Sequence, residues 1–354
     1  MTKVFMKGNE AIGAAAIKAG CKFFFGYPIT PQNELPEYMS RELPKVGGVF
    51  LQAESEVAAI NMVYGASGAG ARVMTSSSSP GISLKMEGIS YIAGAELPCL
   101  IVNIVRGGPG LGGIQPAQSD YFQATKGGGH GDYRLVVLAP NSIQEMCDLV
   151  MEGFDIADQY RNPVMVLGDG MLGQMMEAVE FKEPKKRKLP PKDWATTGIK
   201  SESGEKRLIN SLFIQPEDLE NHNLKLQMKY EEIKKNETKY ESLDVDDAEI
   251  ILTAYGTTSR IVNSAIRALK KEGIKAGMIR PITLWPFPYE AYEKAADSAK
   301  AFLTVEMSLG QMVEDVRLGV NGKKPVYFYG RTGGMLPDPV EIVEKVKEIL
   351  GGAV

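Results

Sequence analysis

The sequence predicts an α/β protein built from two successive domains, of which the second is the smaller. Its length of 354 residues exceeds one ordinary domain of roughly 100–200 residues and fits about two. Hydrophobic residues make up 44% of the chain, which is enough to form a sizeable core. Short apolar runs alternate with helical patterns in two separate stretches, and this alternation is typical of mostly parallel sheets with helices on both faces.

The first stretch, residues 1–176, carries most of the predicted strands. β-Branched and aromatic residues form candidate strands at 22–25, 49–52, 72–75, 99–105, 134–138 and 164–167. Helical patterns separate them, for example at 11–19, which ends before Gly20, and at 56–66. Because the apolar runs are nearly continuous, we expect a parallel sheet that is buried on both faces.

Residues 177–247 differ in composition and predict a charged linker. They contain a basic run at 182–192 with acidic residues around it, which favours a solvated segment over an anion-binding one. Within the linker, residues 217–240 are polar nearly all round. This pattern predicts an exposed helix that packs against another part of the protein.

The alternation of strands and helices resumes in residues 248–354 and predicts the second α/β domain. Candidate strands lie at 249–253, 275–279, 301–305 and 326–329, and candidate helices at 259–271 and 338–350. We find no convincing internal repeat between this stretch and the first one.

Charge and composition exclude several classes of function. The chain has 40 basic and 44 acidic side chains, so it lacks the basic surface that nucleic acids and anionic membranes attract. Its 3 cysteines and 2 histidines are too few and too scattered for a disulfide framework, an iron–sulfur cluster or a histidine-rich metal site. The longest apolar stretch, 97–105, is too short to span a membrane. We therefore expect a cytoplasmic protein with reduced cysteines and no metal of its own.

Two glycine motifs resemble cofactor sites only in part. Residues 108–113 match GxGxxG, but a proline-containing loop follows them where a dinucleotide site needs a helix. Residues 168–170 read Gly-Asp-Gly, the start of a thiamine-diphosphate magnesium motif, yet residues 194–199 lack the expected asparagine. A magnesium site is therefore not expected, and we predict that Asp169 caps the following helix.

Polar residues follow several of the predicted strands, where ligands bind in open α/β sheets. The serine run 76–79 precedes Pro80, which predicts a helix start capped by hydroxyl groups, with no histidine base or nucleophile elbow nearby. Thr30 followed by Pro31 likewise predicts a capped helix start. Spacing alone leaves open whether Thr30 also contacts a ligand.

Two charged positions are stronger candidates for chemistry. Glu54 and Glu56 lie at the start of a predicted helix, where an acid is favoured by the helix dipole whatever its function. Apolar residues follow Glu56 directly, and a carboxyl group in such surroundings can donate a proton or a strong hydrogen bond. Arg106 ends the strand 99–105, where a guanidinium can bind a substrate carboxylate. A surface ion pair is the alternative for Arg106.

Taken together, the motifs resemble a known family. The segments in question read Tyr-Pro-Ile-Thr-Pro, Gln-Ala-Glu-Ser-Glu-Val-Ala-Ala-Ile, Arg-Gly-Gly-Pro, Gln-Ser-Asp, Val-Glu-Met-Ser-Leu-Gly-Gln-Met and Tyr-Phe-Tyr-Gly-Arg, and begin at residues 27, 52, 106, 118, 305 and 327. In this order and over almost the whole chain, they resemble the α-type subunit of the 2-oxoacid:ferredoxin oxidoreductases. The 2-ketoisovalerate (3-methyl-2-oxobutanoate) type is the most similar, and the 2-oxoglutarate type is its near neighbour.

The resemblance implies a thiamine-diphosphate pyrimidine-binding domain followed by a transketolase-C-terminal-like domain. It also implies a reaction, the oxidative decarboxylation of a 2-oxoacid to acyl-CoA and carbon dioxide, with electrons passed to ferredoxin. By the same resemblance, Glu56 contacts N1′ of the aminopyrimidine ring, and Tyr27, Pro28 and Ile29 help to bind the cofactor. Thr30 and Arg106 bind the 2-oxoacid, chiefly through its carboxylate.

The resemblance further implies that the chain works only with partner chains. A β subunit is expected to hold the diphosphate and Mg²⁺, while γ and ferredoxin-like subunits complete the complex and the iron–sulfur clusters lie on partner chains only. Three alternatives remain beside the 2-oxoglutarate type: a non-redox, transketolase-like thiamine enzyme, a non-catalytic docking module, and an NAD-dependent dehydrogenase using residues 108–113. The sequence leaves open the preferred 2-oxoacid, the stoichiometry, the coenzyme A contacts and the direction of the reaction.

Overall fold

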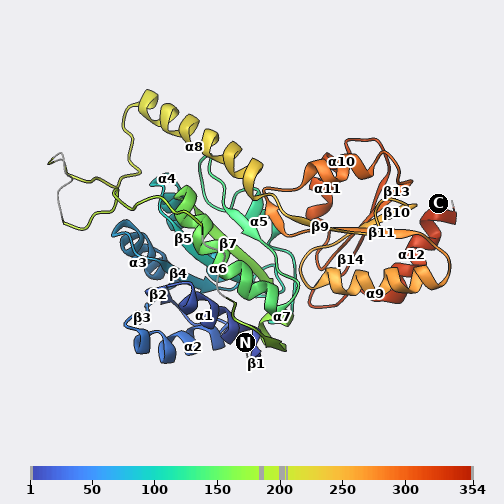
Figure 1. The fold of residues 1–354 in the computed structure, drawn as a ribbon, viewed down its shortest axis with the longest axis horizontal. Helices are drawn as coiled ribbons and strands as arrows, with labels where there is room; N and C mark the ends of the chain where they lie inside the picture. Colours follow the sequence, from blue (N-terminus) through green and yellow to red (C-terminus); the bar gives the residue numbers. More distant parts are fainter. Residues whose placement is uncertain (1–2, 183–186, 199–203, 205, 352–354) are drawn as a thin grey trace.

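The computed structural model describes residues 3–182, 187–198, 204 and 206–351. Parts of the predicted linker, residues 183–186, 199–203 and 205, lie outside the described residues, as do 1–2 and 352–354. The described residues form a seven-stranded sheet, a five-stranded sheet and a separate pair of strands. The two larger sheets occupy opposite ends of an elongated molecule (Figure 1).

The seven-stranded sheet confirms the buried parallel sheet predicted for the first stretch. Its order is β12-β6-β7-β5-β4-β2-β3, and every pairing in it is parallel except β6 with β12. The strands are β2 (Phe23–Gly26), β3 (Val49–Gln52), β4 (Val73–Ser77), β5 (Cys99–Val105), β6 (Val136–Leu138), β7 (Pro163–Asp169) and β12 (Thr283–Trp285). All residues of β4, β5 and β7 are buried, as their apolar runs predict.

Helices cover both faces of this sheet. They are α1 (Gly8–Lys18), α2 (Glu34–Glu42), the 3₁₀ turn η1 (Pro44–Val46), α3 (Glu56–Gly68), α4 (Pro80–Gly94), α5 (Tyr121–Thr125), α6 (Ile143–Tyr160) and α7 (Gly170–Gln174). Side chains alternate along β5: Ile101 packs in the core under α3 and α4, whereas Leu100 and Val102 pack in the core under α1 and α6. This alternation is the period of two that a strand between two helical layers requires.

The five-stranded sheet forms the second domain. It follows the order β14-β13-β10-β11-β9, and only β9 is antiparallel to its neighbour. Its strands are β9 (Tyr240–Leu243), β10 (Ile250–Thr253), β11 (Ala276–Pro281), β13 (Ala301–Glu306) and β14 (Val326–Gly330). Its helices are α9 (Thr258–Lys271), α10 (Tyr289–Ala295), α11 (Met312–Val320) and α12 (Pro339–Gly351). The predicted strands are confirmed, while β9, β12, α10 and α11 were not predicted.

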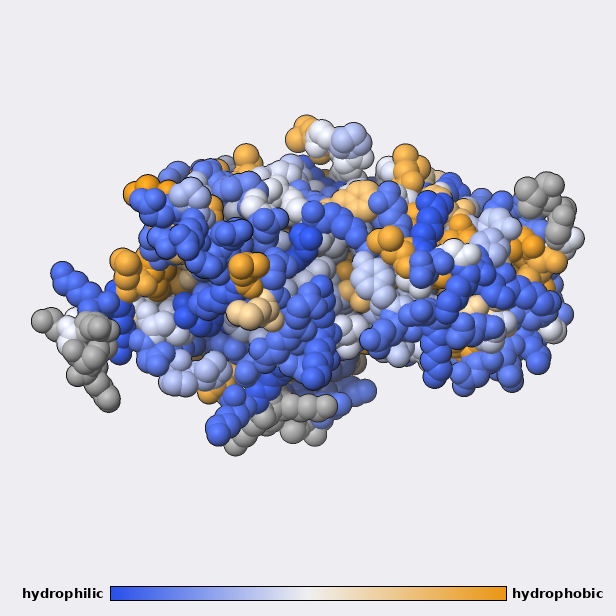
Figure 2. Space-filling view, turned by 90° about the horizontal axis from the view of Figure 1, so that it is seen from above, coloured by the Kyte–Doolittle hydropathy of each residue, from blue (hydrophilic) through white to orange (hydrophobic). Residues whose placement is uncertain are grey.

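The linker contains the predicted exposed helix, α8 (Pro216–Glu237). It crosses the top of the first domain in Figure 1 and buries Leu226, Tyr230 and Ile233 in the core under α1 and α6. These residues recur at helical spacing, so one narrow stripe of an otherwise polar helix is apolar. Seen from above, the surface is mostly hydrophilic, with apolar side chains in small separate groups (Figure 2).

Two short strands near the ends of the first stretch escaped prediction. β1 (Val4–Lys7) pairs antiparallel with β8 (Met176–Val179), and most of their residues are exposed or half-buried. The division of the chain into 1–176, 177–247 and 248–354 stays a prediction. No helix in the described ranges is long and apolar enough to cross a membrane.

Candidate active site

The candidate site lies where four neighbouring strands of the first sheet end. In the order β5-β4-β2-β3, these strands lead into Arg106, the serine turn, the Thr30 loop and Glu56 respectively. Because parallel strands share one carboxyl edge, all four segments reach the same edge of the sheet. The structure therefore gathers residues that are far apart in the sequence.

Arg106 is held rigidly at the end of β5. Its guanidinium donates hydrogen bonds to the carbonyl oxygens of Thr30, at 2.9 Å, and Leu111, at 3.2 Å. The residue is only 7% exposed, yet its Nε is buried without a hydrogen-bond partner. The structure thus brings Arg106 and Thr30 together through the threonine backbone, and leaves a buried N–H group of the arginine for another partner.

The Thr30 loop differs from the prediction. Helix α2 begins at Glu34, after Asn33 in the N-cap position, so the predicted helix start at Thr30 and Pro31 is wrong. The chain turns for three more residues because Asn9 Nδ2 and Gln174 Nε2 both donate to the Pro31 carbonyl, at 2.8 and 2.9 Å. Thr30 is left exposed at the sheet edge.

The other predicted cofactor-binding residues lie in the same loop, directly after β2. Tyr27 and Pro28 are exposed and Ile29 is half-buried. All three therefore sit at the carboxyl edge of the sheet with surface available to a ligand, and their predicted role stays a prediction.

Glu56 is the first residue of α3 and points inward. It is 6% exposed, whereas Glu54 is exposed, so burial distinguishes the two predicted acids in favour of Glu56. Ser55 caps the helix, since its Oγ accepts a hydrogen bond of 3.1 Å from the amide of Ala58. Among the described residues, none donates a hydrogen bond to the Glu56 carboxylate.

Gly81, in the first turn of α4, makes room for that carboxylate. A Cβ atom at Gly81 would lie 2.8 Å from Glu56 Oε1 and 2.0 Å from Ser77 Oγ. Neither oxygen could stay in place against such an atom, because real Cβ contacts are not this short. The glycine is thus required by the position of Glu56, and nothing in the sequence around it signals this.

The serine turn is partly as predicted. Helix α4 begins at Pro80 after Ser79, but Ser79 makes no side-chain cap hydrogen bond. Its Oγ instead accepts from the Arg106 amide, at 3.1 Å, and its own amide donates to Asn103 Oδ1, at 3.1 Å. These bonds hold Ser79 at a φ of 23°, a strained value for a residue with a side chain.

Several buried polar atoms around this edge have no partner within the chain. They are Ser77 Oγ, Ser78 Oγ, Gln32 Nε2 and Arg106 Nε. Buried polar groups are normally hydrogen-bonded, so a cluster of unpartnered ones calls for an explanation such as a bound ligand. With the Glu56 carboxylate beside them, these residues fit the polar aminopyrimidine half of a thiamine cofactor.

The Gly-Asp-Gly segment does not contribute a free ligand. Asp169 Oδ1 accepts hydrogen bonds from the amides of Met171 and Leu172, at 2.9 and 3.1 Å, and its Oδ2 accepts one from Thr257. The prediction that Asp169 caps a helix is confirmed. Within the described residues, no group of three or more histidine, cysteine or acidic side chains is arranged to hold a metal.

The glycine loop after Arg106 forms a turn, as its proline-containing continuation predicts. The amide of Gly107 donates to the Gln115 carbonyl and the amide of Gly113 donates to the Gly107 carbonyl. The next helix, α5, begins only at Tyr121. The last glycine of the GxGxxG match therefore opens no helix for a pyrophosphate.

The second domain forms one wall of a cavity beside Thr30. This cavity has a volume of about 530 Å³ and is lined by Thr30, Pro31, Ile114, Gln115, Pro116, Gly170, Met171, Gln174, Gly334 and Leu336. Sequence reasoning missed Gly334 and Leu336, which are more than 200 residues from Thr30 and meet it only through the packing of the two domains.

Two glutamines from the family-like segments that begin at residues 118 and 305 form hydrogen bonds between the two domains. Gln118 donates to the Tyr255 carbonyl, at 2.9 Å, and accepts from Thr258 Oγ1, at 2.8 Å, and from the Met307 amide, at 3.0 Å. Gln311 donates to the Ser119 carbonyl, at 2.8 Å. These motif residues therefore act in domain packing, a role that the sequence did not suggest.

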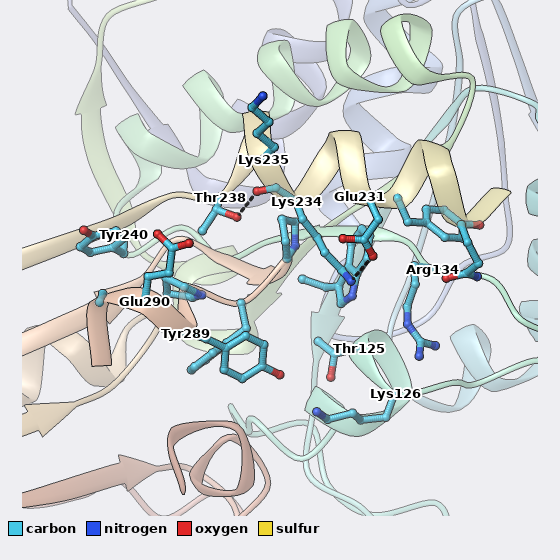
Figure 3. Close-up of a pocket in the computed structure, with 17 residues that line it drawn as sticks. Thr125, Lys126, Arg134, Glu231, Lys234, Lys235, Thr238, Tyr240, Tyr289 and Glu290 are labelled. Atoms are coloured by element: carbon cyan, nitrogen blue, oxygen red, sulfur yellow. Dashed lines mark hydrogen bonds and ion pairs between the residues drawn. The ribbon is translucent and has the colours of Figure 1, made fainter. Parts of the chain in front are cut away.

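A larger cavity lies elsewhere, at the opposite edge of the first sheet. It has a volume of about 870 Å³ and is lined by residues of α8, α10 and the segments before β6 and after β12 (Figure 3). Two of its lysines are already paired: Lys234 with Glu231, at 2.7 Å, and Lys126 with Asp315, at 2.5 Å. It shares no lining residue with the candidate site.

Comparison with known families identifies both parts of the chain. The family described as pyruvate flavodoxin/ferredoxin oxidoreductase, thiamine-diphosphate-binding domain, matches residues 14–242. Core domain II of pyruvate:ferredoxin oxidoreductase matches residues 248–342. The ketoisovalerate oxidoreductase subunit VorB of Methanothermobacter thermautotrophicus is 52% identical over 351 residues, which cover 99% of both chains.

Two solved structures share the fold of this chain. The 2-oxoglutarate:ferredoxin oxidoreductase from Magnetococcus marinus, with 2-oxoglutarate, coenzyme A and succinyl-CoA bound, has a chain that is 30% identical with a TM-score of 0.87. The match covers 98% of this chain but 65% of that one. An inactive β4 tetramer of a split-gene transketolase shares the fold at 14% identity, with a TM-score of 0.63 and 98% of both chains covered.

These findings confirm the predicted fold class and the resemblance read from the motifs. Both family matches follow the predicted order, a thiamine-diphosphate-binding part and then a second domain. The chain belongs to the 2-oxoacid:ferredoxin oxidoreductase family, as an α-type subunit with a thiamine-diphosphate-binding domain.

Proposed function

We propose that the chain is the catalytic α subunit of a 2-ketoisovalerate:ferredoxin oxidoreductase. The complex would convert a branched-chain 2-oxoacid and coenzyme A to acyl-CoA and carbon dioxide, with electrons passed to ferredoxin. The similarity to the VorB subunit supports the substrate. The single structural observation that carries the proposal is the buried Glu56 carboxylate beside polar atoms that lack partners.

Glu56 is the proposed catalytic residue. When bound, thiamine diphosphate supplies the carbon nucleophile and the electron sink for decarboxylation. Glu56 would hydrogen-bond N1′ of the pyrimidine and exchange a proton with it, a role that needs a carboxyl group at a water-poor position. Tyr27, Pro28 and Ile29 would bind the same ring from the loop after β2, which ends at the same edge.

Arg106 and Thr30 are the proposed substrate-binding residues. Arg106 is positioned by the Thr30 and Leu111 carbonyls and keeps one buried N–H group free. A guanidinium fixed in this way can donate a charge-assisted hydrogen bond to the 2-oxoacid carboxylate. The exposed Thr30 hydroxyl would complete that contact. The substrate carboxylate would thus be fixed before the bond to carbon dioxide breaks.

The cavity beside Thr30 favours an aliphatic substrate side chain. Its lining includes Pro31, Ile114, Pro116, Met171 and Leu336, and no charged side chain. A second carboxylate, as in 2-oxoglutarate, would find no cation among the residues that line this cavity. The 2-oxoglutarate type remains the alternative, and it would require a cation from a partner chain.

Partner chains would supply what this subunit lacks. We propose that a β subunit holds the diphosphate and Mg²⁺, because Asp169 is already engaged as a helix cap and by Thr257. Iron–sulfur clusters would lie on γ, ferredoxin-like or other partner chains. Cys21, Cys99 and Cys147 are free, buried and far apart in sequence. We place the complex in the cytoplasm, where such thiols stay reduced.

The test is the substrate preference of the native complex. The complex would be purified anaerobically with its partners and assayed by dye reduction with coenzyme A and a panel of 2-oxoacids. We expect the highest kcat/KM with 2-ketoisovalerate and a much lower value with 2-oxoglutarate. A preference for 2-oxoglutarate would assign the other subtype, and turnover without any electron acceptor would point to a non-redox thiamine enzyme.

A further inference from the structure

Lys85 is a buried cation for which the proposed mechanism gives no use. It lies on α4 and is 0% exposed. Its Nζ donates hydrogen bonds to Thr75 Oγ1, at 2.6 Å, and to the Ser76 carbonyl, at 3.0 Å, both on β4. No carboxylate of the described residues pairs directly with it. A buried lysine without an ion pair is unfavourable for stability, which suggests another reason for its position.

The geometry of α3 and α4 places Lys85 behind Glu56. Gly81, Lys85 and Gly88 lie four and three residues apart, so they share one face of α4. At one end of this face, a Cβ at Gly81 would lie 2.8 Å from Glu56 Oε1; at the other, a Cβ at Gly88 would lie 2.5 Å from Ile60 Cγ2. Glu56 and Ile60 are one turn apart on α3, so Lys85 lies between the two contacts.

Glu56 is also the main charge that acts on Lys85. Burial lowers the pKa of Lys85 to about 7, and the Glu56 carboxylate opposes this shift most strongly. The other titratable neighbour is Cys99 on β5, a neutral thiol at physiological pH because burial raises its pKa to about 12. The contacts from β4 are an uncharged hydroxyl and a carbonyl.

We propose that Lys85 is a positioning residue, which holds Glu56 ionised and directed toward the pyrimidine of the cofactor. An opposite charge nearby favours the ionised form of a carboxyl group. The proton shared between Glu56 and N1′ then lies closer to the ring nitrogen. This inference rests on the role proposed for Glu56 and adds a second residue that sets its charge.

The test is the pH dependence of thiamine diphosphate binding by the complete complex, measured by titration calorimetry. Because binding of N1′ to a carboxylate takes up a proton, we expect the affinity for thiamine diphosphate to fall as the pH rises. In Lys85→Met, which keeps most of the length of the side chain and removes its charge, this fall should begin about one pH unit higher. Lys225→Met removes a lysine that pairs with Glu96 instead, and should keep the wild-type profile.

Thr75→Val provides a second variant, since it removes one hydrogen-bond acceptor of the ammonium group and should shift the profile in the same direction by less. A folded Lys85→Met complex with a wild-type profile, or with a uniform loss of affinity at every pH, would overturn the proposal. If Lys85→Met does not fold, a wild-type profile for Thr75→Val overturns it. Glu56→Gln separates the two claims: it should abolish the pH dependence, and if it does not, the role of Glu56 itself fails.

Discussion

Gly81→Ala is the sharpest test of the geometry around Glu56. The new methyl group would overlap Ser77 Oγ and approach Glu56 Oε1 to 2.8 Å. Both neighbours are ends of side chains, so they can move without a shift of the backbone. We therefore expect a folded protein in which the Glu56 carboxylate is displaced from its position.

The two consequences differ in size. An extra methyl in a packed site costs roughly 1–3 kcal/mol of stability, while alanine in place of glycine in a helix returns up to about 1 kcal/mol. The net loss of unfolding free energy is then about 0–3 kcal/mol. A lost hydrogen bond from the cofactor to a charged group is worth roughly 1.5–3 kcal/mol, which weakens thiamine diphosphate binding roughly 10–150-fold.

The assay is titration of thiamine diphosphate into the complex, with urea unfolding of the same samples. Gly65→Ala is the matched control, because a Cβ at this α3 glycine meets nothing within 4 Å; it should leave the Kd unchanged and not lower stability. If Gly81→Ala binds the cofactor as tightly as wild type, the placement of Glu56 argued above is refuted.

Three further changes have defined outcomes. Glu56→Gln should remove most 2-oxoacid-dependent dye reduction, because an amide cannot exchange the proton; near-normal turnover would contradict the assignment. Gln118→Ala removes three hydrogen bonds between the domains and should lower the urea midpoint by the equivalent of about 2–4 kcal/mol, whereas an unchanged midpoint would show that these bonds are dispensable. Burial lowers the pKa of Lys85 to about 7 from 10.5. The buried charge therefore lowers the free energy of unfolding by its full amount below pH 7, and this loss disappears as the pH rises toward 10.5. Wild type should therefore gain stability relative to Lys85→Met over this range, by at most about 1.4 kcal/mol per pH unit; a constant difference in urea unfolding would contradict it.

The central strands could be predicted because a strand that is buried on both faces consists almost entirely of apolar residues. β5 and β7 are apolar at nearly every position that faces either helical layer, and a continuous apolar run of this length has few other structures available. β12 could not be found in this way. It has three residues and lies between Pro281 and Pro286. It forms a strand through its antiparallel pairing with β6, which the local sequence does not indicate.

The site was predictable where its residues carry charge. Glu56 and Arg106 could be singled out because each is a charged residue beside an apolar run, where a charge is unfavourable unless it has a partner or a function. The Thr30 loop was misread because its shape depends on Asn9 and Gln174, which bond to Pro31 from other elements. Gly81 and Lys85 gave no signal, since Gly81 has no side chain and Lys85 is indistinguishable from any other helical lysine until its burial is known.

The pairing of β12 with β6 brings a strand from the second half of the chain into the sheet of the first half through backbone hydrogen bonds. A fragment cut within the linker would lose β12 and leave the main-chain N–H and C=O groups of β6 open at an edge. Such an edge is a template for pairing with other molecules. Attempts to express the thiamine-binding half alone should therefore give self-associating material, because β12 is the strand that covers this edge of the sheet.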